Sequence, residues 1–278
     1  MKGTEKKPSL EERLNSLSLP DAIPKPLTQR DVVEQNKEYI RKRASGDLVS
    51  LDTDYERLNK AVGGFEPNTI LTVTGLSGGG KSTLSKRISN SMTKNLIAKD
   101  IDCICLSFNF EMLAHKTVGR EVANKGKFSL KELYSSEHPL AASRMEYIFN
   151  VYHKSILDYP IIYVEEPQNH RDIGNIIYYY WKNLCKATGA YMIVEIDHAV
   201  IIKGMDGSSN EAKTKIDSLM ETLNACKKKI ATEGGNVFYM VLSQMNRDIK
   251  DKDRIQSPSL HYPMSSDLYS SSRQVVLN

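Results

Sequence analysis

Glycines, a lysine and a serine in the first third of the chain have the spacing of a phosphate-binding loop. Residues 75–82 read Gly-Leu-Ser-Gly-Gly-Gly-Lys-Ser, which fits the P-loop pattern G-x-x-x-x-G-K-[ST]. The glycines let the backbone curl so that its N–H groups converge on one cavity, which suits a phosphate chain. In this pattern Lys81 reaches the β- and γ-phosphates, and the Ser82 hydroxyl is a ligand of Mg²⁺. The predicted nucleotide-binding residues are Gly75, Ser77, Gly78, Gly79, Gly80, Lys81, Ser82 and Thr83.

The residues on either side of the loop predict the elements that hold it. Ile70, Leu71 and Val73 form the apolar run of a central parallel strand, and the residues that follow Ser82 predict a helix. The loop would then lie at a helix N-terminus, where free N–H groups and the helix dipole favour an anion. A flexible glycine-rich turn with a chance lysine is the alternative, and the order of strand, loop and helix argues against it.

Three further polar side chains follow predicted strands. Ligands of parallel α/β sheets lie at the carboxyl ends of the strands, so these side chains should meet the P-loop. Asp197 follows YMIVEI and could hold Mg²⁺, although it could also be a simple cap. Glu111 could polarise the water that attacks the γ-phosphate, and Gln244 could sense that phosphate or be an ordinary strand end. The strands are predicted at residues 102–108, 160–164, 191–196 and 236–242, besides the one before the loop.

Other glutamates compete with Glu111 for the role of catalytic base. Glu165 and Glu166 end a predicted strand, but they could instead cap the helix that follows. Glu195 alternates with Asp197 and therefore shares its face, although it lies within the strand. The pattern by itself leaves these alternatives open.

The rest of the chain alternates strands with helices. This alternation predicts an α/β fold, with a mostly parallel sheet and helices on both faces. Helices are predicted at residues 28–45, 51–65, 113–124, 129–134, 140–157, 169–187 and 211–232. The predicted organisation is a flexible N-terminal arm over residues 1–27, a helical linker over 28–50 and the ATPase core over 51–278.

Composition places the chain among globular proteins. It has 278 residues, 40% hydrophobic content, a net charge of +4 and four cysteines. Cys103 and Cys105 share one face of a predicted strand and fit small core residues. Since no C-x-x-C pair or Cys/His cluster occurs, neither a zinc site nor a disulfide framework is predicted. A signal peptide and a long apolar run are also missing, so we expect a cytoplasmic protein without membrane contact.

Five blocks in order resemble the RecA-like ATPase domain of DnaB-type replicative helicases. They are LNKAVGGFEPNTILTVTGLSGGGKST, CLSFNFEM, MIVEIDHAVII, MVLSQMNRDI and PMSSDLYSSSRQV, within roughly residues 31–277. The resemblance implies a RecA-like P-loop NTPase fold. It implies Glu111 as the catalytic base, Asp197 as the Walker B aspartate that binds Mg²⁺, and Gln244 and Arg247 as residues of the last strand and the loop after it. Lys81 and Gln244 would join Glu111 in catalysis.

The family implies an ATP-dependent DNA helicase motor. It would translocate on single-stranded DNA during replication and hydrolyse ATP at the interfaces of a homo-oligomeric ring, a hexamer by resemblance. Residues 28–45 resemble the linker helix that packs on the adjacent subunit, and a primase or a helicase loader would be a partner. Basic residues of two channel loops could bind DNA, or could be ordinary solvated charges: Lys203, Lys213, Arg247, Lys250, Lys252 and Arg254.

The sequence departs from the family pattern in several places. The primase-contacting N-terminal domain and the extreme C-terminal basic segment are expected to be missing. Tyr269 stands where the family often has arginine, and His198 where it often has tyrosine. The alternatives are therefore a RecA/RadA-like recombination or loading ATPase, and a nucleotide-binding subunit with little turnover.

Overall fold

The computed structural model describes residues 9–16, 26–203 and 212–245. The chain divides into two compact units, Met1–Val49 and Ser50–Asn278. No helix in the described ranges is long and apolar enough to cross a membrane.

The described residues of the first unit form two helices with well-formed N-termini. In α1 (Leu10–Asn15) and α2 (Gln29–Ser45) the capping residue and the third helical residue bond reciprocally. For α2 these residues are Thr28 and Asp31, and they satisfy N–H groups that a helix start leaves free. Gly46 ends α2 with a left-handed φ of 83°. Within this described helix no residue is buried, so its apolar side chains are exposed.

In the described residues of the second unit, five parallel strands form a sheet in the order β1-β5-β4-β2-β3. Because all strands run the same way, their carboxyl ends meet at one edge. There Gly75 lies opposite Gln244, and Asn109 lies opposite Asp197. The strands are β1 (Ile70–Gly75), β2 (Cys103–Asn109), β3 (Ile161–Val164), β4 (Tyr191–Asp197) and β5 (Asn236–Gln244).

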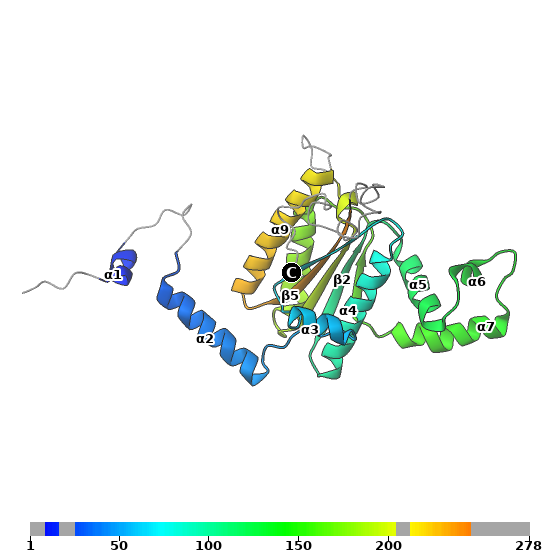
Figure 1. The fold of residues 1–278 in the computed structure, drawn as a ribbon, viewed down its shortest axis with the longest axis horizontal. Helices are drawn as coiled ribbons and strands as arrows, with labels where there is room; N and C mark the ends of the chain where they lie inside the picture. Colours follow the sequence, from blue (N-terminus) through cyan, green and yellow to red (C-terminus); the bar gives the residue numbers. More distant parts are fainter. Residues whose placement is uncertain (1–8, 17–25, 204–211, 246–278) are drawn as a thin grey trace, which may run out of the picture. The chain divides into compact units, whose positions relative to one another are not determined.

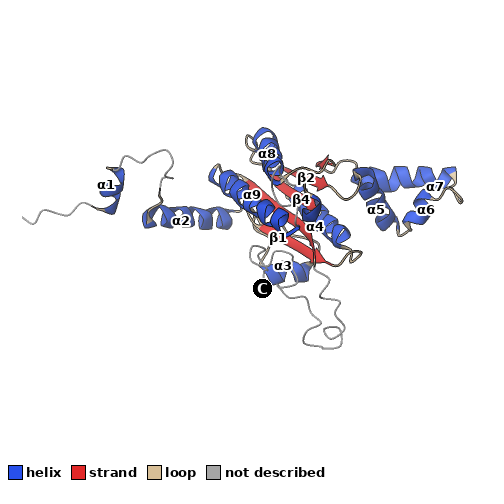
Figure 2. Ribbon diagram, turned by 90° about the horizontal axis from the view of Figure 1, so that it is seen from above, coloured by secondary structure: helices blue, strands red, loops and turns tan. Residues whose placement is uncertain are grey.

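Helices cover both faces of the sheet, as predicted (Figure 2). One face carries α4 (Lys81–Ala98), which contacts four of the strands. The other face carries α8 (His170–Tyr180), the π-helical turn η3 (Trp181–Cys185) and α9 (Ala212–Thr232).

The main apolar core lies between the sheet and the second set of helices. Alternate side chains of the central strands point into it and are fully buried, including Phe108, Val194 and Tyr239. Trp181 packs there from η3. The opposite face, under α4, holds the predicted core residues Cys103 and Cys105, both buried with free thiols. It also holds two buried polar residues, Ser107 and Glu195.

The remaining helices occupy the connections. Between β2 and β3, α5, α6, α7 and η1 pack beside the sheet (Figure 1). Their bounds, with the other short helices, are α3 (Glu56–Val62), α5 (Ala114–Gly126), α6 (Leu130–Tyr134), α7 (Ala142–Tyr147), η1 (Ile148–His153), η2 (Lys154–Ile156) and η4 (Ala199–Ile201).

Several predicted boundaries shift. The single helix expected at residues 140–157 is divided into α-helical, π-helical and 3-10 parts. The helix expected at 51–65 is shorter, because Leu51 and Phe65 pair with each other as an isolated antiparallel bridge. Strand β4 includes Asp197 and β5 includes Gln244, because ladder pairing continues to these residues.

Candidate active site

The loop between β1 and α4 has the conformation that its glycines allow. Gly78 and Gly80 have φ values of 77° and 82°, in the left-handed region where other residues are disfavoured. Gly79 N donates to Leu76 O over 3.0 Å, and a Cβ on Gly79 would lie only 3.0 Å from that oxygen. Three successive glycines are thus required by the turn itself, and the turn delivers the chain to the N-terminus of α4.

Lys81 begins α4 and folds back across the loop. Its Nζ donates to Gly75 O over 3.1 Å and to Leu76 O over 3.0 Å. These bonds hold the ammonium inside the loop, beside free N–H groups at the start of the helix. A positive charge and converging N–H groups fit the phosphates of a nucleotide.

Asp197 ends β4 next to Ser82. Burial raises the pKa of Asp197 to about 6, while a hydrogen bond from the Ser82 side chain lowers it. Asp197 Oδ1 is buried and has no hydrogen-bond partner among the described residues. A buried carboxylate oxygen left without a donor, beside a hydroxyl, fits a hard cation such as Mg²⁺.

The described residues offer no other metal centre. Within them, no group of three or more His, Cys, Asp and Glu side chains could hold a metal ion. Ser82 and Asp197 would supply only part of an octahedral shell. Mg²⁺ usually takes one or two protein ligands together with substrate phosphates and water, so two suffice.

Glu111 lies two residues beyond β2, at the same edge of the sheet. Its side chain is 52% exposed, and its Oε2 lies 3.8 Å from Nε2 of the largely buried His198. Burial lowers the pKa of His198, Glu111 raises it and Lys81 lowers it. Phe110 N donates to Asp197 O over 2.8 Å, which extends the pairing of the two strands to the residue before Glu111. Glu111 is therefore accessible to solvent and adjacent to the candidate metal ligand.

The competing glutamates have other contacts. Glu165 Oε1 accepts a hydrogen bond from Ala114 N, the first residue of α5. The interpretation of Glu165 and Glu166 as caps of the following helix is wrong, because Glu165 caps the preceding α5 and Asn169 caps α8. Glu195 is buried within β4 under α4.

Gln244 is the last residue of β5 and lies opposite Gly75. The next residue, Met245, donates its N–H to Gly75 O over 3.3 Å. The end of β5 is thus attached to the first glycine of the P-loop, which places Gln244 beside the loop.

The structure describes few of the predicted DNA-binding residues. Lys203 is exposed, and its N–H donates to Gln168 O over 3.0 Å. Lys213 belongs to α9, but its side chain lies outside the described residues, as do Arg247, Lys250, Lys252 and Arg254 as a whole.

A cavity of about 460 Å³ extends from the candidate metal ligands along α4. Its lining includes Ser82, Asp197, Lys86 and Glu195. Lys86 belongs to none of the motifs in the sequence. The available signal was the run of polar residues Ser85, Lys86 and Ser89 on the helix face that covers the sheet, where apolar side chains are usual.

Comparisons with known proteins show the family and the fold of the chain. The model of the DnaB-like helicase C-terminal domain family matches residues 50–274. The chain is similar to a solved ATPase domain, with 16% identity and a TM-score of 0.68 over 90% of this chain and 80% of that one. It is also similar to a DnaB-like replicative helicase described with its interactions with primase, with 16% identity and a TM-score of 0.66 over 87% of this chain and 53% of that one. No curated protein sequence matches the chain. The structural likenesses confirm the predicted RecA-like fold.

Proposed function

Since the chain belongs to the DnaB-like helicase C-terminal domain family and is thus an ATP-hydrolysing DNA helicase of the replicative type, we propose that residues 75–83 bind ATP with Mg²⁺. The observation that carries this proposal is the buried, unpartnered oxygen of Asp197 beside Ser82 at the start of the P-loop helix. Ser82 and Asp197 would hold the metal ion. When bound, Mg²⁺ neutralises charge on the β- and γ-phosphates.

Three further side chains around this site would bind the phosphates, activate the attacking water and respond to the loss of the γ-phosphate. Lys81 binds the β- and γ-phosphates through its ammonium, which the loop carbonyls already orient. Glu111 orients the attacking water and accepts its proton, and its exposure leaves room for that water. Gln244 contacts the γ-phosphate and links its loss to the loop after β5, through the attachment of β5 to Gly75.

The proposal also includes the DNA that the chain binds and the oligomer that it forms. We propose that single-stranded DNA passes along basic side chains, of which Lys203 is the described example. The family favours a homohexamer in the cytoplasm, with residues 28–50 as the linker to a neighbouring subunit, and a primase or a loader as partner. The exposed apolar side chains of α2 support such a linker, because a helix with no buried residue still has its apolar face to cover.

Phosphate release with and without single-stranded DNA tests this proposal. The wild-type chain should release phosphate from Mg-ATP, and single-stranded DNA should increase the rate. If DNA leaves the rate unchanged, the motor proposal is wrong for this chain. ATP-dependent assembly without phosphate release would support the nucleotide-binding subunit with little turnover.

A further inference from the structure

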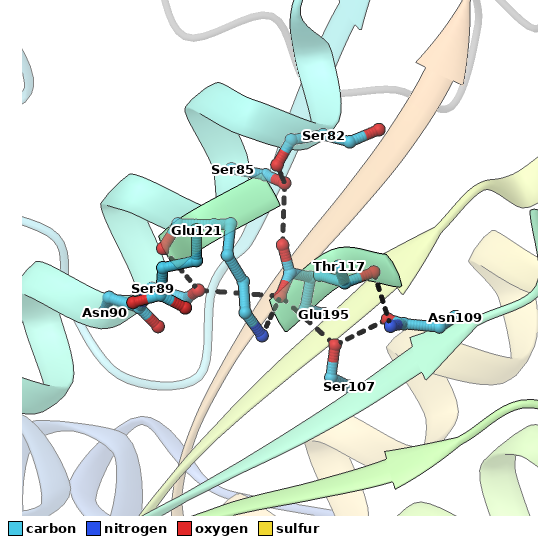
Figure 3. Close-up of polar contacts among 10 residues, drawn as sticks. Ser82, Ser85, Ser89, Asn90, Ser107, Asn109, Thr117, Glu121 and Glu195 are labelled. Atoms are coloured by element: carbon cyan, nitrogen blue, oxygen red, sulfur yellow. Dashed lines mark hydrogen bonds and ion pairs between the residues drawn. The ribbon is translucent and has the colours of Figure 1, made fainter. Parts of the chain in front are cut away.

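A carboxylate lies in the middle of β4, where a buried strand normally has an apolar residue. Glu195 is 3% exposed, and Figure 3 shows it surrounded by donors from two directions. Ser85 Oγ donates to its Oε1 over 2.6 Å. Its Oε2 lies 3.5 Å from Lys86 Nζ and 3.3 Å from Ser107 Oγ. Glu195 therefore joins the P-loop helix to both β4 and β2.

The ion pair is not explained by stability. Lys86 is 7% exposed, so both charges have lost most of their water. Burial alone lowers the pKa of Lys86, but Glu195, with Cys105 and Tyr163, raises it overall, and the lysine stays charged. Its Nζ has the ion pair but no hydrogen bond of good geometry in the described structure. Well-packed apolar residues in place of such a pair are often as stable or more stable. A role in the site is the better explanation.

The pair lies directly beneath the candidate metal ligands. Ser82 and Ser85 are three residues apart on α4 and share one face of the helix, while Asp197 and Glu195 are two residues apart on β4 and share one face of the strand. Ser82 lies beside Asp197 and lowers its pKa, and Ser85 donates a hydrogen bond to Glu195. These two parallel contacts fix the distance between helix and strand at and just below the metal site.

The same carboxylate reaches the strand that leads to Glu111. Ser107 lies opposite Glu195, and its Oγ is also 2.9 Å from Asn109 Oδ1. Asn109 Nδ2 donates to Thr117 Oγ1 of α5 over 3.1 Å (Figure 3). A hydroxyl has one hydrogen, so Ser107 donates to Glu195 or to Asn109 at a given moment. Ser107 thus lies between the buried carboxylate and Asn109, which is two residues before Glu111.

We propose that Glu195, paired with Lys86, is a positioning residue for ATP hydrolysis. It holds α4 against β4 and β2 so that Ser82, Asp197 and Glu111 keep the separation that metal binding and water activation require. This inference rests on the proposed function of those three residues.

The test replaces the pair by apolar residues of similar size, in the double variant Lys86→Met/Glu195→Leu. We expect an unchanged or higher unfolding temperature and an unchanged KM for ATP. We expect kcat to fall about 10- to 100-fold, and the Mg²⁺ concentration for half-maximal rate to rise by a similar factor, as when supports of metal ligands are lost. The control is the double variant Lys186→Met/Glu233→Leu, which removes an ion pair of 2.5 Å that involves none of the site residues. This control should change neither kcat nor the Mg²⁺ concentration for half-maximal rate.

Two results would overturn the inference. One is a folded double variant with the kcat and Mg²⁺ dependence of the wild type. The other result concerns a second variant, Ser85→Ala, which is measured if the double variant does not fold. This smaller change removes the donor to Oε1 and leaves Lys86 and Ser107 beside Oε2. Wild-type values of kcat and Mg²⁺ dependence in that variant would refute the positioning role. A failure of the proposed function is distinct, because the wild type itself would then release no phosphate.

Discussion

Ser85 Oγ donates to Glu195 Oε1 over 2.6 Å, one helical turn after Ser82, which lies beside Asp197 and lowers its pKa. The P-loop helix is thus attached to the central strand twice, once at the candidate metal site and once in the buried layer below it. The phosphate-binding loop cannot shift along the sheet without breaking a buried, charge-assisted hydrogen bond, which is among the stronger contacts available to it.

Lys81→Ala should weaken ATP binding about 10- to 100-fold, as expected when a charged hydrogen-bond donor is removed. The loop carbonyls that orient Lys81 would remain, so the fold should persist. Calorimetric titration with ATP measures the change. Lys60→Ala is the control, because Lys60 is exposed and pairs only with Glu56 within α3. An equal loss in both variants would contradict a specific phosphate contact.

Glu111→Gln should bind ATP normally but lower kcat by about 100- to 10,000-fold, the usual contribution of a general base. Single-turnover phosphate release, with nucleotide binding measured in parallel, separates the two effects. Glu165→Gln serves as the comparison, because Glu165 caps α5. That variant should turn over ATP. If it loses turnover while Glu111→Gln keeps it, the base has been misassigned.

His170 should make stability depend on pH. Its Nδ1 lies 2.8 Å from Thr222 Oγ1. Burial lowers its pKa below the usual 6.5, Arg171 lowers it further and Asp172 raises it. The folded state therefore favours the neutral ring, so the unfolded chain binds the proton first as pH falls through 6.5. The contribution of His170 to the free energy of unfolding is therefore complete above pH 6.5 and is lost as the pH falls below this value.

Denaturant unfolding at several pH values measures this effect. The advantage of the wild type over His170→Gln should shrink on going from about pH 8 to about pH 5.5. A constant difference between the two proteins would show that His170 does not titrate differently in the folded state.

Gly174→Ala should destabilise the protein by about 1–3 kcal/mol, the cost of overpacking. Alanine normally favours a helix over glycine, but a Cβ at Gly174 in α8 would lie 2.6 Å from Thr222 Cγ2 in α9. Asn175→Ala, at the exposed neighbouring position, should cause no loss. Urea denaturation measures both. A stabilised Gly174→Ala variant would show that α8 and α9 can separate without cost.

The fold and the P-loop could be predicted because their signals are local. The apolar run before Gly75 and the spacing up to Ser82 define strand, loop and helix within one short segment. The family could be predicted for the same reason, because each block that carries the resemblance is continuous in sequence. The match of the family model confirms it. The sequence pattern predicts the ends of β4 and β5 too early. Polar residues such as Asp197 and Gln244 look like strand ends, yet ladder pairing with neighbouring strands includes them.

The buried contacts could not be predicted in this way. Alternation along the strand predicts that Glu195 shares a face with Asp197, but the partner Lys86 lies on another element far away in sequence. The cap that Glu165 provides to α5 likewise joins segments that no local pattern connects. Such pairs depend on how helices pack on the sheet, which periodicity does not specify.

Strand separation of a forked DNA with a 5′ overhang tests the helicase motor most directly. With ATP and Mg²⁺ the wild-type chain should separate the strands, and Glu111→Gln should bind the fork without separating it. DNA-stimulated phosphate release by the wild type with no strand separation would contradict the motor and would instead fit a recombination or loading ATPase.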